Sequence, residues 1–393
     1  MIGKIPTAWL QLKHNTLRSI VALSGITFAV VMIFMQLGFR TALFDSAVRL
    51  HQSLQGDIFL ISPRSTSLTA MENFPKIRLE QTLAFPEVEF VTPIYLGFAQ
   101  WKNPETNNYW RPIYTIGFEL RQGVFNLSGV QDNLEKLKLP NVVLFDQASR
   151  SEFGPIVSEL EKRGTVTTEV GNRGPGNRRI TVVGLFRLGT SFGADGNLLT
   201  SDLNFLRIFP QEQEGLIEIG LIKLKPGVAQ NIILNKIKKQ LPQDVKVLSK
   251  SEFVDFEKSY WQSSTAIGFI FNLSVAMAII VGIVIVYQIL YTNVADYLPE
   301  YATLKAIGYT NQYLLNIVFQ EAIILAVLGY LQGAIIALVS YKISREATSL
   351  PIAMESSRAL LVLAFTILMC CIAGAIAMNK LRDADPSDIF NLR

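Results

Sequence analysis

Histidine and cysteine are almost absent from this chain, which has two of each among 393 residues. The cysteines, Cys370 and Cys371, are adjacent in an apolar stretch near the end of the chain, so the large polar region cannot be held together by disulfides. Two histidines and two membrane-buried cysteines also provide no nitrogen or sulfur cluster for zinc. We therefore expect no metal centre and no cofactor bound by this chain.

Catalytic motifs are also scarce. The sequence has no G-x-x-x-x-G-K-[ST] loop, so the chain does not bind ATP phosphates in that way. One stretch, "GTSFG" at 189–193, matches the G-x-S-x-G nucleophile elbow with Ser191 as the nucleophile. In that fold the histidine base follows the serine, whereas His14 and His51 both precede it. We interpret the stretch as a glycine-rich turn and predict a protein that is not an enzyme.

Charged residues are few, at 17% of the chain, whereas 50% of residues are hydrophobic and the mean hydropathy is +0.31. This balance is typical of a membrane protein. Each of four segments lacks charge and approaches the roughly 20 residues that a helix needs to cross a bilayer. The segments are 19–39, 266–290, 322–341 and 359–378. We predict four transmembrane α-helices.

The spacing of these segments sets the domain organisation. A large extracytoplasmic domain is expected between the first and second helices, and the other connections are short. The predicted parts are an interfacial amphipathic segment at 1–16, transmembrane helices at 17–43, 261–291, 313–342 and 358–380, the extracytoplasmic domain with stalk ends at 44–260, a cytoplasmic coupling-helix loop at 292–312, a short external loop at 343–357 and a cytoplasmic tail at 381–393.

Basic residues at the two ends of the chain predict its orientation in the membrane. Lys4, Lys13 and Arg18 precede the first apolar segment with no acidic residue among them, and Lys380 and Arg382 follow the last. Positive charge favours the cytoplasmic side. Both termini are therefore expected in the cytoplasm, with the large domain on the opposite side of the membrane.

The large domain is predicted to have an α+β fold. "VEFVTPIYLGFAQW" and "WRPIYTIGFEL" are rich in β-branched and aromatic residues, and "RRITVVGLF" follows a glycine-rich tip as the second arm of a hairpin. Near its end, two strand-like stretches flank a helix, giving a β-α-β unit. The apolar face of that helix is predicted to carry Val228, Ile232, Ile233, Ile237 and Leu241.

Helices that continue beyond the bilayer would give this domain a stalk. From Asn15 to about Gln55 the sequence contains no proline. At 1.5 Å per residue, a helix over this stretch would be roughly 60 Å long, about twice the hydrocarbon core. The stretch "SEFVDFEKSYWQSS" could extend the second transmembrane helix in the same direction. We expect the domain to stand on these two helices.

A short amphipathic segment, "EYATLKAIGYTNQYLLN", separates the second and third apolar segments. A helix following Pro299 would place Tyr301, Leu304 and Ile307 on one side, and Gly308 is suited to end it. Joined at both ends to transmembrane helices, such a helix would act as a lever whose apolar face needs a partner. A helix lying on the lipid surface is the simpler alternative.

Small residues recur at four-residue spacing in two of the apolar segments, which lets helix backbones approach closely. Packing within one subunit and dimerisation both remain open at this stage. Glu321 is the only acidic residue near an apolar segment, and we expect a structural role rather than a proton site. The small residues are Ser274, Ala278 and Gly282 in the second segment and Gly329, Gly333 and Ala337 in the third.

The stretch from Glu300 to Leu338, "EYATLKAIGYTNQYLLNIVFQEAIILAVLGYLQGAIIAL", resembles the signature of FtsX-like permeases of the MacB type. The resemblance covers the whole chain, from the entry "WLQLKHNTLRSIVALSGITFAV" to the closing "LRDADPSDIF". Within this family, "FRLGTSFGADGNLLTSDLNFLR" resembles the DevC branch of cyanobacterial permeases, which are associated with heterocyst glycolipid export.

The resemblance implies a permease homodimer that works by mechanotransmission with a separate ABC ATPase, which binds the ATP. It further implies a bacterial inner-membrane location with the large domain in the periplasm, a periplasmic membrane-fusion adaptor and a TolC-like outer-membrane duct. The implied cargo is a lipid or another amphiphile, and no nucleic acid partner is expected. Matched to the family, the coupling helix contains Tyr301, Leu304, Lys305, Ile307 and Gly308, and Glu321 matches the family glutamate. The alternatives are an FtsX-like signalling protein that activates a periplasmic hydrolase and a lipoprotein-releasing permease.

Overall fold

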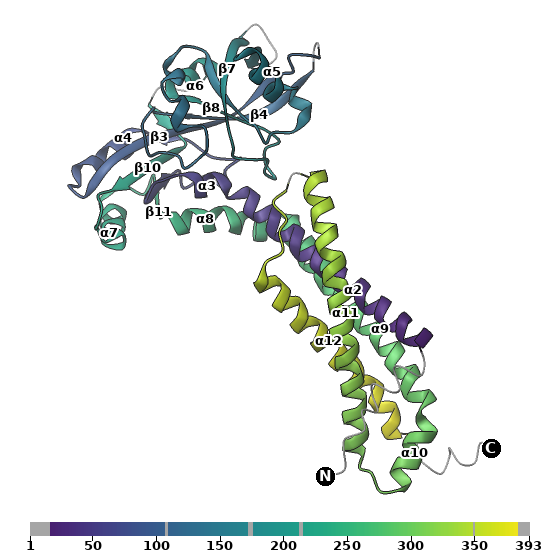
Figure 1. The fold of residues 1–393 in the computed structure, drawn as a ribbon. Helices are drawn as coiled ribbons and strands as arrows, with labels where there is room; N and C mark the ends of the chain where they lie inside the picture. The colour runs from purple at the N-terminus through teal and green to yellow at the C-terminus, as the bar shows by residue number, and fades with distance from the viewer. Residues whose placement is uncertain (1–15, 107–108, 172–175, 212–214, 349, 384–393) are drawn as a thin grey trace. The chain divides into compact units, whose positions relative to one another are not determined.

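The computed structural model describes residues 16–106, 109–171, 176–211, 215–348 and 350–383. It divides into two compact units. The helical unit contains the residues up to Ala42, Ala266–Thr348 and the residues from Ile352 onward, and the α/β unit contains Leu43–Thr265 with 349–351 (Figure 1). The amphipathic segment expected before residue 16 and the tail after residue 383 lie outside the described residues.

Four helices are long and apolar enough to cross a membrane, which confirms the predicted number. They lie within α2 (Thr16–Ala47), α9 (Ala266–Asp296), α11 (Asn311–Thr348) and α12 (Ser356–Asp383). Helix α12 packs against both α9 and α11 (Figure 1). The short helix α10 (Leu298–Ala306) connects α9 to α11.

The predicted helix extensions are interrupted. Helix α2 runs without a break to Ala47, and after a turn at Val48 the chain continues as α3 (Arg49–Ser53) instead of one helix to residue 55. On the other side, α8 (Lys250–Ser259) is followed by a π-helical turn at Tyr260–Ser264. Thr265 is extended, with φ −119° and ψ 155°, and separates this turn from α9. A side-chain bond from Thr265 Oγ1 to the Trp261 carbonyl, at 2.8 Å, holds that break.

The α/β unit is built on a mixed sheet that, in the described residues, has nine strands in the order β11-β1-β10-β3-β4-β8-β5-β7-β6. Strand β6 also pairs with the end of β3, so the strands from β3 to β6 form a closed ring. A small second sheet pairs β2 (Phe74–Pro75) with β9 (Leu216–Ile217). The main strands are β1 (Ile58–Ile61), β3 (Val88–Lys102), β4 (Trp110–Phe118), β5 (Val142–Asp146), β6 (Val166–Gly171), β7 (Arg178–Phe186), β8 (Asn197–Ser201), β10 (Ile219–Leu224) and β11 (Lys246–Ser249).

The sheet separates two hydrophobic cores. In β1, Ile58 and Leu60 belong to one core and Phe59 and Ile61 to the other, and all four residues are fully buried. A strand covered on both faces needs apolar residues at every position, because successive side chains point to opposite faces. This explains the uninterrupted sequence IFLI.

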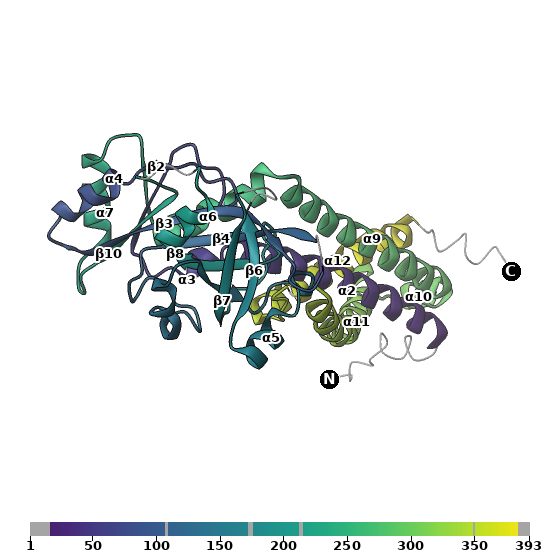
Figure 2. The same cartoon turned by 90° about the horizontal axis from the view of Figure 1, so that it is seen from above.

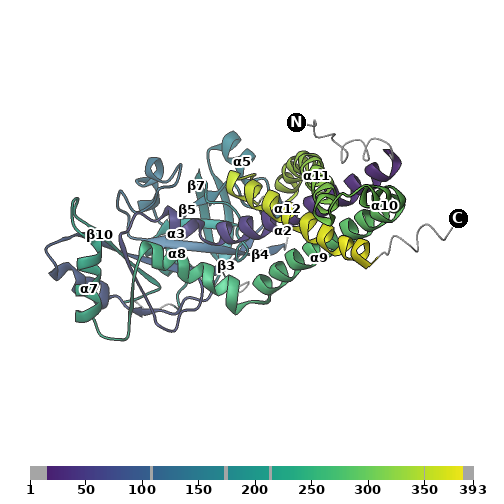
Figure 3. The same cartoon turned by 90° about the horizontal axis from the view of Figure 1, so that it is seen from below.

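Helices cover both faces of the sheet. Helix α6 (Asp202–Ile208) lies over β3, β4 and β8 (Figure 2). It shares its core with α5 (Ile156–Arg163) and α7 (Gln230–Gln240). On the opposite core, α3 and α8 lie side by side beneath the sheet (Figure 3). The α4 helix (Ile77–Glu80) contacts β3 and β10.

The predicted hairpin and the closing β-α-β unit are present in modified form. Strands β6 and β7 pair antiparallel on either side of the glycine-rich tip. Strands β10 and β11 flank α7 in the chain, but β1 lies between them in the sheet. The prediction for α7 was wrong at one position: Ile232 is 59% exposed, whereas Leu234 is buried with Ile233 and Ile237. Each helical residue turns by 100°, so Leu234 and not Ile232 shares the face of Ile237.

Candidate functional sites in the two units

The short helix predicted between the second and third apolar segments is present as α10, with Pro299 in its first turn. Gly308 has φ +106°, a left-handed conformation that favours glycine, and its N–H donates to the Lys305 carbonyl at 3.1 Å. The Tyr309 N–H donates to the Leu304 carbonyl at 3.1 Å. These bonds cap the last turn of the helix, and Gly308 therefore sets the sharp turn into α11.

The apolar face expected on this helix is only partly uncovered. Leu304 packs against Val294, Ile317 and Val318 of α9 and α11 and is half-buried, so it is less free for a partner than the sequence pattern suggests. The neighbouring helices cover it because α10 contacts α9 directly. Lys305 is half-buried, and the side chain of Tyr301 lies outside the described residues.

Ile307 and two tyrosines form the exposed part of this region. Ile307 is 72% exposed, and the tilted rings of Tyr309 and Tyr313 lie against each other with their centroids 4.6 Å apart. We call Ile307, Tyr309 and Tyr313 the loop patch. An aliphatic and two aromatic side chains exposed together are typical of a protein contact surface.

Two of the small residues on α11 pack against α2 of the same chain. A Cβ atom added at Gly329 would lie 2.5 Å from Ile26 Cγ2, and one added at Gly333 would lie 2.5 Å from Val30 Cγ1. Ala337, one turn further along, is fully buried. The close approach of α2 and α11 therefore uses this stripe within one subunit.

The small residues on α9 are arranged similarly. A Cβ atom at Gly282 would lie 2.1 Å from Met369 Sδ of α12 and 3.1 Å from Ala29 Cβ of α2. Ala278 is 9% exposed, and Ser274 is half-buried. Gly282 thus lets α9 pack closely against α12 and α2 of the same chain.

Glu321 is buried in α11, with 1% of its surface exposed. A snorkelling side chain would be exposed, so the structure favours an internal role. Another polar contact lies further along α11, where Thr27 Oγ1 donates to Gln332 Oε1 at 3.1 Å. Such contacts satisfy polar groups among the spanning helices.

In the α/β unit, a buried carboxylate organises a loop that sequence reasoning treated only as a turn. Asp146, at the end of β5, is fully buried. Its carboxylate accepts from the backbone N–H groups of Leu188 at 3.1 Å and Gly189 at 2.8 Å, and from Asn197 Nδ2 at 2.8 Å. We call residues 187–196 the root loop. Asp146 holds the start of this loop by satisfying its donors.

Arg49, the first residue of α3, connects the root loop to the segment that follows α2. Its Nη1 donates to the carbonyls of Leu188 at 3.3 Å and Thr190 at 3.5 Å. Burial lowers the pKa of the Arg49 guanidinium, and the nearby Asp146 acts in the opposite direction. Gly189 has φ +95°, and a Cβ atom there would lie 1.9 Å from Arg49 Nη1. This glycine is needed both for its backbone conformation and for the approach of Arg49.

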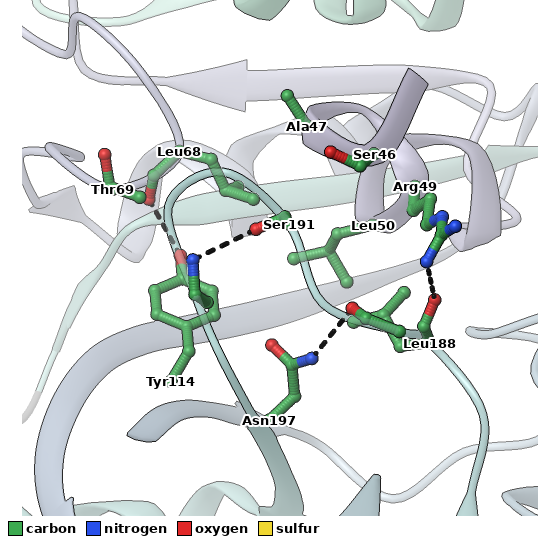
Figure 4. A pocket seen from close by; sticks show the side chains of 12 residues that line it. Ser46, Ala47, Arg49, Leu50, Leu68, Thr69, Tyr114, Leu188, Ser191 and Asn197 are labelled. Carbon is green, nitrogen blue, oxygen red and sulfur yellow. Dashed lines mark hydrogen bonds between the residues drawn. The ribbon is translucent and has the colours of Figure 1, made fainter. Parts of the chain in front are cut away.

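Ser191 is part of the turn and not of a catalytic group. Its Oγ accepts from the Ala194 N–H at 3.1 Å, and its own N–H donates to the Ala194 carbonyl at 2.9 Å. Neither nitrogen of His51 has a hydrogen-bond partner, so His51 does not activate the serine. Figure 4 shows the cavity beside Ser191, lined in part by Arg49, Tyr114 and Asn197. Its volume of about 20 Å³ holds no more than a water molecule.

A second buried carboxylate lies near the end of α8. Glu257 Oε2 accepts from the Leu68 N–H at 2.6 Å, and Oε1 accepts from Trp261 Nε1 at 2.8 Å. The Leu68 carbonyl accepts from the Tyr114 hydroxyl at 2.7 Å. We call residues 65–70 the strap. Glu257 thus fastens both the strap and the π-helical turn that precedes α9 to the α/β core.

The root loop and the strap also contact each other and the π-helical turn. A Cβ atom at Gly193 would lie 2.3 Å from Thr69 Cγ2, so this glycine lets the strap approach. Phe192 stacks edge-on against Trp261, with ring centroids 4.8 Å apart. The segments following α2 and preceding α9 are therefore fastened to one connected group of residues. In the sequence, only the two glycines of "GTSFG" pointed to this arrangement. They indicated a close backbone approach but not which residues make the contact.

Comparison with known proteins places these features in a family. The MacB-like periplasmic core domain model matches residues 19–240, and the FtsX-like permease C-terminal model matches residues 272–386. No curated protein sequence matches the chain.

Two solved structures are similar to part of the chain. The periplasmic region of MacB from Actinobacillus actinomycetemcomitans is 14% identical, with a TM-score of 0.34, over 51% of this chain and 91% of that one. The extracellular domain of the noncanonic ABC-type transporter YknZ from Gram-positive bacteria is 12% identical, with a TM-score of 0.32, over 49% of this chain and 99% of that one. On the two family matches, which together include most of the large domain and all or most of each of the four apolar helices, the chain is a member of the MacB/FtsX-like family of ABC transporter permeases.

Proposed function

We propose that this chain is the permease of an ABC exporter that works by mechanotransmission. The observation that carries the proposal is the fastening of the segments next to α2 and α9 to the MacB-like domain, through Arg49 on one side and Glu257 with Trp261 on the other. A displacement of either helix along its axis would thus be passed to the core of the domain. ATP is bound by a separate ATPase, and the permease itself is non-catalytic.

The loop patch is the proposed ATPase contact. It lies beside α10, which is joined through short turns to α9 and α11. A displacement of the patch by the ATPase would therefore be passed to both helices. Tyr301, Leu304, Lys305 and Gly308 then act in different ways. Leu304 anchors α10 to its neighbours and Gly308 shapes the turn, while Tyr301 and Lys305 complete the contact.

The proposed assembly contains two copies of this chain, the ATPase, a periplasmic adaptor and a TolC-like duct. The cargo is proposed to be a lipid or another amphiphile such as a glycolipid, as in the DevC branch. The spanning helices carry few polar groups, and Thr27 and Gln332 bond to each other, so they provide little lining for a hydrophilic path. The periplasmic domain is therefore the proposed site of cargo handling.

Purification of the full chain with its partners tests this function. From native membranes, we expect the tagged chain to retain an ABC ATPase and a membrane-fusion adaptor, identified by mass spectrometry. A lipoprotein chaperone in place of the adaptor would support lipoprotein release, and a cell-wall hydrolase would support FtsX-like signalling. The mixed α/β domain of more than 200 residues favours transport over signalling.

Cysteine labelling tests the proposed orientation. In a variant whose Cys370 and Cys371 are replaced by alanine, Ser158→Cys on α5 and Thr310→Cys beside α10 each introduce one thiol at an exposed position. We expect a membrane-impermeant maleimide to label Ser158→Cys in intact spheroplasts and Thr310→Cys only after lysis. The reverse pattern would place the large domain in the cytoplasm and reject the proposed arrangement.

A further inference from the structure

His51, on α3, is a fully buried histidine whose two ring nitrogens have no hydrogen-bond partner. Its ring lies against Phe253 of α8, with centroids 4.2 Å apart. An unsatisfied buried polar group is destabilising, because it has lost its hydrogen bonds to water without gaining others. The proposed mechanotransmission does not involve His51. The groups packed around it must therefore account for a buried histidine at this position.

A titratable group, Glu257, lies close to this ring, with its Oε2 at 3.9 Å from His51 Nε2. Both oxygens of this carboxyl are already used as acceptors, by the Leu68 N–H and by Trp261 Nε1. In the described residues, His51 is the only basic group within ion-pair distance of Glu257. Burial raises the pKa of Glu257 to about 7, partly opposed by the bonds from Trp261 and Leu68. Burial also lowers the pKa of His51 to about 3, so the imidazole is neutral near pH 7, where Glu257 titrates.

The other charged groups around this pair do not neutralise it. Tyr114, from β4, bonds to the strap, and burial raises the pKa of its phenol. Glu218, which is also buried, accepts from the Leu96 N–H at 3.0 Å and supplies no positive charge. Lys258, next to Glu257 in the chain, lies 3.8 Å from Asp45 instead. A carboxylate at position 257 is thus uncompensated, and a neutral acid is favoured there.

We propose that Glu257 and His51 form a proton-operated clasp that alternately fastens the strap and α3. When ionised, Glu257 accepts from Leu68 and Trp261 and leaves His51 without a partner. When Glu257 takes one proton from solvent onto Oε2, the new O–H has a free acceptor in the neutral Nε2 of His51. Oε2 then turns toward His51 and becomes a weaker acceptor for Leu68, while Oε1 keeps Trp261. No other bond forms or breaks.

The direction of the pH dependence follows from the two states. Below about pH 7, protonated Glu257 donates to His51 of α3 and its hydrogen bond from the strap is weakened. Above about pH 7, ionised Glu257 accepts fully from the Leu68 N–H of the strap. The folded-state pKa of Glu257 exceeds its ordinary value of 4.5, so the contribution of Glu257 to stability is complete below pH 4.5 and is lost as the pH rises through about 7. The clasp does not depend on transport. One consequence rests on the proposed function. Acidification of the periplasm would weaken the hydrogen bond between the strap and Glu257 of α8, and so loosen the domain from the segment that leads into α9.

Infrared difference spectroscopy of the full chain in nanodiscs tests protonation directly. Between pH 5 and pH 9, we expect a carboxylic-acid C=O band that titrates near pH 7. Glu257→Gln should abolish this band, and Glu218→Gln, the matched buried carboxyl, should leave it in place. His51→Phe removes the acceptor and a buried polar group without introducing charge. In that variant we expect the band to persist and to titrate at lower pH.

Hydrogen exchange at the strap tests the switch itself. After correction for the intrinsic rate, protection of the Leu68 amide should fall about tenfold from pH 8 to pH 6 in the wild type, because one hydrogen bond to a charged acceptor is weakened. His51→Phe should reduce this fall to less than about twofold, since the protonated acid no longer has an acceptor to turn toward. An absent Glu257 band, or identical Leu68 exchange in wild type and His51→Phe, would overturn the clasp. Neither readout needs an ATPase, so failure of the transport proposal leaves this test intact.

Discussion

Ile307→Asp is expected to reduce co-purification of the ATPase with the chain about thirtyfold, because a charge buried in an apolar contact costs roughly 2 kcal/mol or more. Ile307 is the most exposed apolar side chain of the loop patch, at 72%, so the substitution removes no internal packing. The effect should be measured as the apparent Kd between the detergent-solubilised chain and its ATPase. Stimulation of ATP hydrolysis should fall in parallel.

Two variants control this experiment. Ile307→Leu keeps an apolar side chain of the same size and should bind the ATPase within about twofold of the wild type. Ile232→Asp places the same charge at an isoleucine on α7 that is 59% exposed, and should not change binding. Equal binding by Ile307→Asp and the wild type would refute the patch as the ATPase contact. Leu304→Asp is less informative, because Leu304 packs against Ile317 and Val318.

Asp146→Ala is expected to destabilise the α/β unit by about 3–5 kcal/mol, the cost typical of removing one member of a buried charged network. The substitution leaves the N–H groups of Leu188 and Gly189 and the amide of Asn197 without their acceptor. It also removes the negative charge that faces Arg49. The free energy of unfolding should be measured by denaturant titration of the full chain, with fluorescence of the tryptophans as the probe.

Asp244→Asn provides the matched control for Asp146. Asp244 forms an ion pair with Arg78 at 2.8 Å, but its side chain is 42% exposed. Exposed ion pairs contribute about 0–1 kcal/mol, so this variant should unfold almost as the wild type does. If Asp146→Ala were equally mild, the root loop would be held by other contacts, and its proposed part in force transmission would fail.

Local sequence patterns predicted the elements whose stability depends on neighbouring residues in the chain. Uncharged runs identified four apolar helices, since the cost of burying charge in lipid adds up along a segment. Gly308 was placed correctly at the end of α10, because a left-handed residue there requires little more than the local backbone. The β6–β7 hairpin followed from its turn residues for the same reason.

Positions that depend on which neighbour covers a face could not be predicted. Tyr301, Leu304 and Ile307 share one helical face in the sequence pattern, yet Leu304 is covered by α9 and α11 while Ile307 is exposed. Ile232 and Leu234 are both apolar, and only the position of the sheet selects Leu234 for burial. Periodicity gives the direction of a side chain relative to its helix but not what lies there.

By itself, the amino-acid sequence determined that this protein is a membrane permease with four apolar helices, a large mixed domain and no catalytic motif. Only the tertiary structure brought together Asp146 with Gly189, Arg49 with Leu188, and His51 with Glu257. Leu68 and Glu257 are 189 residues apart in the chain, and no local pattern encodes their hydrogen bond. The physical reason is that buried polar groups are stabilised by partners that become neighbours only when the whole sheet and its covering helices have formed.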